Sequence, residues 1–210
     1  MKLIAVNIGK PEPIPAKSAL TGIYKRPQAG PVAIDPLGLE GDAVLDRKHH
    51  GGVDQAVYVY FQADYDWWDA QMGSAFAPGT FGENLVISGI DGRTVSVGDR
   101  FAIGPVVLEV TCHRTPCSVF AARMGDPKWL KTFYRAGRPG AYCRVIAPGA
   151  VEAGMDVGYE PFAGEQVTIG ELLALEGQRE IARDTLERAL RAPVHYKMRE
   201  DFEARLATLF

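Results

Sequence analysis

Short apolar runs separated by glycine and proline make up the first three quarters of this chain. Its 210 residues include 23 glycines and 14 prolines, and most of both lie before residue 163. Between them stand β-branched and aromatic segments such as KLIAVNI, GPVAI, AVYVYF, PVVLEVTC and YCRVI. Runs of this kind predict β-strands, and the frequent turn residues predict a mostly antiparallel sandwich or barrel.

Two helices are expected within this β-rich part. QADYDWWDAQMG, residues 62–73, repeats large apolar side chains at helical spacing and ends at a glycine. GDPKWLKTFYRAG, residues 125–137, offers Asp126 as N-cap, Pro127 as the first helical residue and Gly137 as the end. The expected fold class is therefore mostly β with some α-helix.

The last quarter of the chain has a different composition, rich in leucine, alanine, glutamate and arginine. VTIGELLALEG is expected to form a helix that begins with a capping box of Thr168 and Glu171. Two amphipathic helices follow, REIARDTLERALRA and HYKMREDFEARLATLF, separated by Pro193. We therefore predict a β-barrel domain over residues 1–162 and a three-helix domain over residues 163–210, which would serve in packing or in a homodimer.

Charge and cysteine content exclude several classes of partner. The net charge is −3, whereas nucleic-acid-binding domains usually carry a basic excess, so no nucleic acid partner is expected. No apolar stretch is long enough to span a membrane, and the N-terminal run is too short for a signal peptide. Three cysteines, an odd number, indicate a reducing compartment. We expect a cytoplasmic protein with no membrane partner.

TCHRTPCSVF, residues 111–120, holds two of the three cysteines. Alternate residues of a strand share a face, so Cys112 falls with Leu108 and Val110 and is expected to act as a small core residue. The same parity argument places Cys143 on an apolar face. Both cysteines are therefore expected to be structural.

Cys117 differs because Thr115 and Pro116 can end the strand and begin a helix, with Thr115 as N-cap. A thiol in the first helical turn faces unpaired N–H groups and the positive end of the helix dipole, and Arg114 lies close by. Both features favour the thiolate, the form that attacks or binds metal. The alternative is a thiol buried on an apolar helical face. The C-x4-C spacing from Cys112 disfavours a zinc knuckle or a redox disulfide.

Three further segments carry residues that could bind a ligand. RKHHGG, with Arg47 and His50, joins basic side chains to glycines that let backbone amides approach an anion, although a solvated hairpin is the alternative. PGTFGENLV could offer Asn84 and backbone amides to a heterocycle. Arg144 lies on the strand RPGAYCRV, and Lys25 lies in AKSALTGIYKRP.

Taken in order, these segments resemble the motifs of the MOSC domain family: GLEGD, D-x-x-x-HGG-x-D-x-AVY-x-Y, GTFGENL, R-T-PC and GRPGAY-x-RV. The chain is most similar to the YiiM-type branch, in which a C-terminal three-helix domain follows the barrel. The resemblance implies a MOSC-type β-barrel that binds the pyranopterin molybdenum cofactor, and no pyridoxal phosphate is expected.

The resemblance also implies the chemistry. Cys117 matches the signature cysteine, which ligates molybdenum and is the catalytic residue of family members that catalyse. The YiiM-type branch is associated with reduction of N-hydroxylated bases such as 6-hydroxylaminopurine, with electrons from a separate flavin reductase. The alternatives are a non-catalytic carrier of the cofactor or of cysteine-bound sulfur, and a binding module without a cofactor. The residues expected to bind the cofactor are Lys25, Arg47, His50, Asn84, Arg114 and Arg144.

Overall fold

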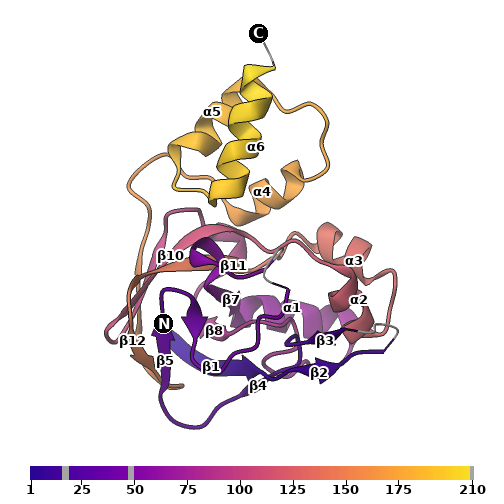
Figure 1. Cartoon of the computed structure of the whole chain (residues 1–210), viewed down its shortest axis with the longest axis vertical. Coiled ribbons are helices and arrows are strands. Elements are labelled where there is room, and N and C mark those ends of the chain that lie inside the picture. Colours follow the sequence, from indigo (N-terminus) through magenta and orange to yellow (C-terminus); the bar gives the residue numbers. More distant parts are fainter. Residues whose placement is uncertain (16–18, 47–49, 209–210) are drawn as a thin grey trace.

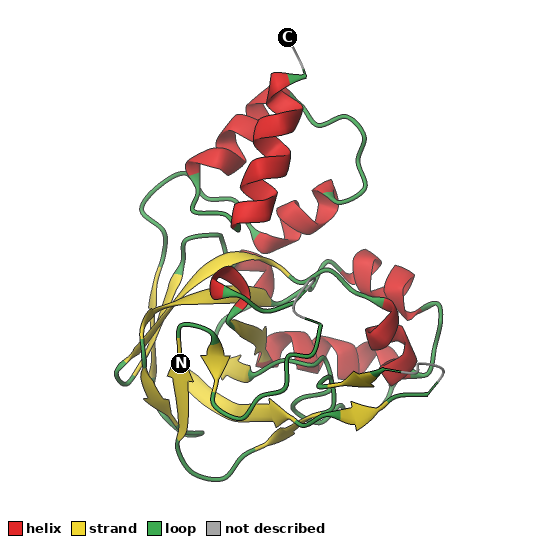
Figure 2. Cartoon of the chain, viewed as in Figure 1, coloured by secondary structure: helices red, strands yellow, loops and turns green. Residues whose placement is uncertain are grey.

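The computed structural model describes residues 1–15, 19–46 and 50–208 (Figures 1 and 2). The strands are β1 (Lys2–Gly9), β2 (Glu12–Pro13), β3 (Leu20–Thr21), β4 (Lys25–Pro27), β5 (Val32–Asp35), β6 (Gly38–Leu39), β7 (Val57–Phe61), β8 (Leu85–Ser88), β9 (Arg100–Ile103), β10 (Val106–His113), β11 (Ala141–Ala147), β12 (Gly149–Val151) and β13 (Val157–Glu160). The helices are α1 (Gln62–Met72), α2 (Ser118–Met124), α3 (Trp129–Ala136), α4 (Ile169–Leu175), α5 (Arg183–Arg191) and α6 (Tyr196–Ala207), with short 3-10 turns η1 (Val53–Gln55) and η2 (Gly92–Thr94).

Eight strands form one curled sheet in the order β13-β9-β10-β11-β7-β8-β1-β4. The β7–β8 pair is parallel and the other described pairs of this sheet are antiparallel. The sheet curls until the start of β1 meets the segment before β13, where Leu3 N donates to Met155 O at 3.0 Å and Val157 N donates to Met1 O at 3.1 Å.

The predicted fold class, β with α, is confirmed, but the expected barrel is not closed. The reason lies in the edge of β1 that does not pair with β8, because this edge has two different partners. Residues 7–9 of β1 pair with β4, and only a single bridge, Lys2 to Asp156, joins its first residues toward β13. Two small sheets, β12-β5-β6 and β2-β3, complete the β-structure that is described.

Strand β7 is buried on both faces. Val57, Val59 and Phe61 point into the main core inside the curled sheet, whereas Tyr58 and Tyr60 point into a second, aromatic core. This division follows from the period of two along a strand. The second core is formed with residues of the three helices α1–α3 and their connections: Tyr65, Trp68, Phe81, Phe120, Trp129 and Phe133.

Helices α1–α3 therefore cover the outer face of the sheet, and their limits largely match the sequence prediction. Gly73 ends α1 in the left-handed region at φ 67°. Helix α3 begins at Trp129, two residues after the predicted Pro127, because the Asp126 carboxylate accepts a hydrogen bond from Lys128 N at 2.8 Å in the preceding turn. Gly137 ends α3 as predicted.

Helices α4–α6 form a compact unit beside the sheet (Figure 1), and all three were predicted. The capping box is present: Glu171 N donates to Thr168 Oγ1 at 3.1 Å and Thr168 N donates to Glu171 Oε2 at 2.7 Å. Pro193 lies between α5 and α6 as predicted. Within the described part of the chain, no helix is both long enough and apolar enough to cross a bilayer.

The helical unit and the sheet domain each contribute a buried residue to the other's core. Ile169 of α4 is fully buried within the main core of the sheet, while Val97, from the sheet domain, is fully buried in the core of the helical unit. Hydrogen bonds run alongside: Val97 N to Val167 O at 2.9 Å and Ile169 N to Val95 O at 3.0 Å. The boundary at residues 162 and 163 stays a prediction, and packing across it is continuous.

We predict that Ile169→Ala lowers the free energy of unfolding by about 2–5 kcal/mol, the usual cost of removing a buried isoleucine side chain. Ile146 is 47% exposed, so Ile146→Ala is the matched control and should change stability by less than about 0.5 kcal/mol. Urea titration followed by circular dichroism measures both. Equal effects would show that Ile169 is not part of the main core.

Candidate functional site

A cavity of about 240 Å³ opens beside β4 and the start of α2. Of the residues predicted to bind a cofactor or metal, it brings together the following: Lys25, His50, Asn84, Arg114 and Cys117. Arg47 lies outside the described residues. Arg144 does not line this cavity. Most of the predicted site therefore converges on one pocket.

Cys117 lies at the junction of the loop after β10 and helix α2. The sequence predicted a thiol inside the first helical turn, with Thr115 as N-cap. In the structure Cys117 is itself the N-cap, with extended backbone at φ −124° and ψ 169°, and the helix begins at Ser118. The prediction was wrong by two residues because the Thr115 hydroxyl donates to Glu176 and does not cap α2.

The surroundings of Cys117 favour its ionised form. Burial raises the pKa of the thiol, but a hydrogen bond with His50 and the charge of Arg114 lower it more, so the pKa falls from 9.0 to about 7. The other two thiols behave differently, because burial raises the pKa of Cys112 to about 12 and that of Cys143 above its ordinary value. We therefore expect Cys117 to be the most reactive of the three cysteines near neutral pH.

Cys112 and Cys143 are both buried, as the parity argument predicted. Cys143 belongs to the main core. The ladder between β10 and β11 is irregular between Val110 and Cys112, and Cys112 consequently leaves that core and borders a second cavity beneath the helical unit. Strict alternation of faces fails at such an irregularity.

Arg114 places a buried cation at the inner end of the pocket. The residue is 5% exposed, and its guanidinium lies 3.9 Å from the centre of the Phe120 ring and 5.5 Å from that of Tyr58. Its Nη1 has no hydrogen-bond partner among the described residues. A buried polar group without a partner is costly, so this nitrogen marks a place where a ligand acceptor would be stabilised.

Asp42 organises the opposite wall of the pocket, and the sequence analysis did not identify it. Its Oδ1 accepts from Gly9 N at 2.8 Å, and its Oδ2 accepts from Asn84 Nδ2 at 2.9 Å and from the Lys25 ammonium. Burial lowers the pKa of Lys25, while the Asp42 carboxylate opposes that shift. The only signal in the sequence was an aspartate after glycine in GLEGD, a pattern typical of ordinary turns.

Asn84 lines the pocket, but its amide serves the scaffold. Its Oδ1 accepts from Tyr58 N at 3.1 Å, and its Nδ2 donates to Asp42 and to Asn7 O at 3.3 Å. Both N–H groups are thus already used. The predicted contact of Asn84 with a heterocycle would require one of these bonds to break.

Arg144 belongs to another part of the molecule. Its Nε lies 3.1 Å from Asp54 Oδ1, and its Nη2 donates to Pro193 O at 3.1 Å. Strand parity correctly groups Arg144 with Tyr142, which lines the pocket. Two residues further along β11, however, the same face meets the helical unit, so the structure does not bring Arg144 to the predicted site.

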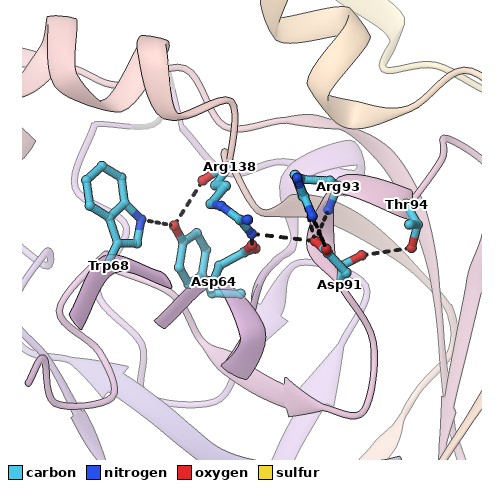
Figure 3. Close-up of polar contacts among 7 residues, drawn as sticks. Asp64, Trp68, Asp91, Arg93, Thr94 and Arg138 are labelled. Atoms are coloured by element: carbon cyan, nitrogen blue, oxygen red, sulfur yellow. Dashed lines mark hydrogen bonds and ion pairs between the residues drawn. The ribbon is translucent and has the colours of Figure 1, made fainter. Parts of the chain in front are cut away.

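The motif GRPGAY also proves to be scaffold (Figure 3). Arg138 is 6% exposed; its Nη1 forms an ion pair with the buried Asp64 carboxylate and lies 3.5 Å from Asp91 Oδ1. Burial raises the pKa of Asp64 to about 6 even though Arg138 opposes this shift. The Arg138 carbonyl accepts from Tyr60 OH at 2.9 Å, and Trp68 Nε1 donates to that hydroxyl at 2.8 Å. The motif joins α1 to β7.

Comparison with known proteins identifies the family. The MOSC domain profile matches residues 46–158. The chain belongs to the MOSC domain family. It is 32% identical to Bacillus subtilis YflK over 157 residues, which cover 74% of this chain and 71% of YflK. It is also 32% identical to Escherichia coli YiiM over 127 residues, covering 59% of this chain and 57% of YiiM.

Two further comparisons define the branch and its limits. The crystal structure of YiiM from Geobacillus stearothermophilus superposes with a TM-score of 0.80 at 26% identity and covers 98% of both chains. That match includes the helical unit, so this MOSC protein belongs to the YiiM-type branch. A Gibberella moniliformis protein named Reductase is 35% identical over 144 residues, which cover 64% of this chain but 26% of that protein.

The MOSC family is associated with molybdenum cofactor binding, and the pocket suits such a group. Thiolate is a soft ligand appropriate to a redox metal. The unpartnered Nη1 of Arg114 could donate to a phosphate or pterin acceptor. Among the described residues, no group of three or more His, Cys, Asp or Glu could hold a metal ion. Cys117 would hold the metal of the cofactor, and Arg114 its organic part.

We predict that iodoacetamide alkylates Cys117 selectively and that the rate rises with pH through a midpoint near 7, because the thiolate is the nucleophile. Cys112 and Cys143 should stay unmodified in the folded protein. Peptide mass mapping over time gives the rate for each cysteine. Equal labelling of all three would contradict the assignment.

We also predict that Asp42→Ala lowers the free energy of unfolding by about 3–5 kcal/mol, since it leaves the buried Lys25 ammonium without its counter-charge. Asp66 is exposed on α1, so Asp66→Ala serves as the matched control and should have little effect. Chemical denaturation measures both. The double variant Asp42→Ala, Lys25→Met should recover much of the loss; failure to recover would contradict the explanation by charge.

Proposed function

We propose that this chain is a molybdenum-cofactor-dependent reductase of N-hydroxylated compounds such as 6-hydroxylaminopurine. The observation that carries the proposal is the pairing, in one pocket, of a cysteine whose pKa is lowered to about 7 with a buried arginine that has an unpartnered nitrogen. Perturbed thiols beside cations are typical of reactive sites. The MOSC fold supplies the expectation of which cofactor the pocket serves.

Each pocket residue has a specific part in this proposal. Cys117 Sγ would ligate the metal, and Arg114 would donate to an acceptor on the cofactor's organic part. Lys25 is held by Asp42 and would contribute positive charge toward the terminal phosphate. His50, which hydrogen-bonds with Cys117, would hold a proton at a ring nitrogen near the reacting atoms.

The proposed reaction balances with a donor of two electrons. Reduction of an N-hydroxyl group to an amine consumes two electrons and two protons, breaks the N–O bond and releases water. The bound cofactor would supply two-electron redox chemistry at molybdenum. A separate flavin reductase would supply the electrons. The three cysteines are free thiols, which agrees with activity in the cytoplasm.

We predict that Cys117→Ser abolishes reduction of 6-hydroxylaminopurine without unfolding the protein. The hydroxyl is similar in size to the thiol but is a harder and more basic ligand. Cys112→Ser makes the same exchange outside the pocket and should retain activity. The assay requires a flavin reductase and a measured molybdenum content for each variant. Full activity of Cys117→Ser would rule out the reductase as stated. Molybdenum-loaded wild type without activity would favour the carrier.

Arg114→Met tests the cofactor contact. Methionine keeps much of the apolar stem of arginine between the aromatic rings but removes the charge. Loss of one charge-assisted hydrogen bond should weaken cofactor binding by about tenfold to hundredfold, equivalent to about 1.5–3 kcal/mol. Molybdenum bound per chain is measured as the cofactor concentration rises. Arg191→Met, on the surface of the helical unit, is the control, and equal affinity of both variants would contradict the role of Arg114.

A further inference from the structure

The helical unit makes two polar contacts with the sheet domain near the Cys117 pocket. One contact involves Glu176, which directly follows α4, and reaches His113 and Thr115. The other involves the backbone at the start of α6 and reaches Asp54, which lies four residues after His50. The two segments that meet at the His50–Cys117 hydrogen bond are thus each fastened to the same unit.

The Glu176 contact uses both carboxylate oxygens. Oε1 lies 2.8 Å from Nε2 of His113, which is the last residue of β10. The same oxygen accepts a hydrogen bond from the Thr115 hydroxyl. Oε2 accepts from Tyr134 OH of α3 at 2.6 Å. One side chain of the helical unit therefore holds the end of a strand, the loop before Cys117 and the helix that packs on α2.

Local geometry directs Glu176 to this role. Helix α4 ends at Leu175, and Glu176 has extended backbone at φ −60° and ψ 133°, so its side chain leaves the helix. Burial raises the pKa of Glu176, but the hydrogen bonds from His113, Thr115 and Tyr134 lower it more, to below its ordinary value. The carboxylate is consequently ionised at neutral pH and is a strong acceptor for all three donors.

The second contact fixes the segment that carries His50. Asp54 Oδ2 accepts from Tyr196 N at 2.9 Å, and its Oδ1 lies 3.1 Å from Arg144 Nε. Arg144 in turn donates to Pro193 O at 3.1 Å. Beside them, His195 N donates to Thr111 O at 3.0 Å. The start of α6 is therefore tied to the turn that follows the HGG motif.

We propose that Glu176 is a positioning residue for Cys117: the helical unit uses this carboxylate to hold the segment 113–117, and with it the thiol, against His50 and Arg114. Both the hydrogen bond with His50 and the influence of the Arg114 charge on the thiol depend on where the sulfur lies. The inference goes beyond the proposed function, since it concerns the reactivity of the thiol itself and needs no cofactor.

Four variants of the whole chain show whether Glu176 acts on Cys117 by positioning it or through its negative charge. Glu176→Ala removes all the contacts. Glu176→Asp keeps the charge but is one methylene too short to reach the same donors. Glu176→Gln keeps the length, and its amide can accept from His113 and Thr115 and donate to the Tyr134 oxygen. Glu187→Ala is the matched control, because Glu187 pairs with Arg183 on the exposed face of α5.

The readout is the rate at which iodoacetamide modifies Cys117 at pH 7, in protein from a host that does not make the cofactor. We expect Glu176→Ala and Glu176→Asp to slow modification by about fivefold, because the thiol is then no longer held in the electropositive surroundings that make a cysteine reactive. Glu176→Gln and Glu187→Ala should react at the wild-type rate. Cys143 should stay protected in every variant, which excludes general loosening of the fold.

Other outcomes would overturn the proposal. Wild-type rates in Glu176→Ala and Glu176→Asp would mean that the contact does not position the thiol. Faster modification in both Glu176→Ala and Glu176→Gln would mean that Glu176 acts through its charge. Labelling of Cys143 in Glu176→Asp would mean that the residue only stabilises the fold. If the protein proved to lack the reductase activity proposed above, each of these results would keep its meaning, because none of the measurements uses molybdenum.

Discussion

Burial of both faces of β7 is the constraint on which the rest of the molecule depends. Val59 and Phe61 need the main core on one side, and Tyr60 needs the aromatic core on the other. A strand that is apolar on both faces requires cover on both, and α1–α3 provide it on the outer face. Because α2 begins at Ser118, the cover that β7 demands also fixes where Cys117 lies.

The buried cations are of two kinds. Those paired with a buried carboxylate hold the fold together, whereas Arg114, which has an unpartnered nitrogen, lines the candidate site. Lys25 and Arg138 each have a buried carboxylate partner, Asp42 and Asp64, and these pairs join elements distant in sequence. Arg114 is surrounded by aromatic rings and keeps a nitrogen without a partner. A paired buried charge stabilises a particular arrangement, whereas a buried donor without a partner is a position at which ligand binding gains most.

The sequence placed Cys117 close to the start of a helix because that inference needs only neighbouring residues. A Thr-Pro pair after a strand predicts a helix start, and the cysteine beside it lies within one or two residues of that start whichever cap forms. Arg144 was harder, because alternation along a strand indicates a face but not the neighbour at each point along it. Tyr142 and Arg144 share a face, yet one borders the pocket and the other the helical unit.

Asp42 and Asn84 show a second limit of sequence analysis. A motif such as GTFGEN indicates that a loop is specialised, but not whether its polar groups face a ligand or each other. Asn84 uses its amide to join Tyr58, Asn7 and Asp42, long-range contacts that no local pattern encodes. Helix α4 follows the same rule: the capping box of Thr168 and Glu171 at its start was predictable, whereas the partners of Glu176 after its end were not.

These long-range contacts explain why a thiol near the surface can have a stable, lowered pKa. The lowering depends on a hydrogen bond with His50 and on the charge of Arg114, and His50 comes from a turn far from Cys117 in sequence. A loop held only at its own ends would let the two side chains separate, and the stabilisation of the thiolate would fall with distance. In the arrangement proposed above, the contacts of both segments with one helical unit would restrain their relative motion, although no residue of that unit lines the pocket.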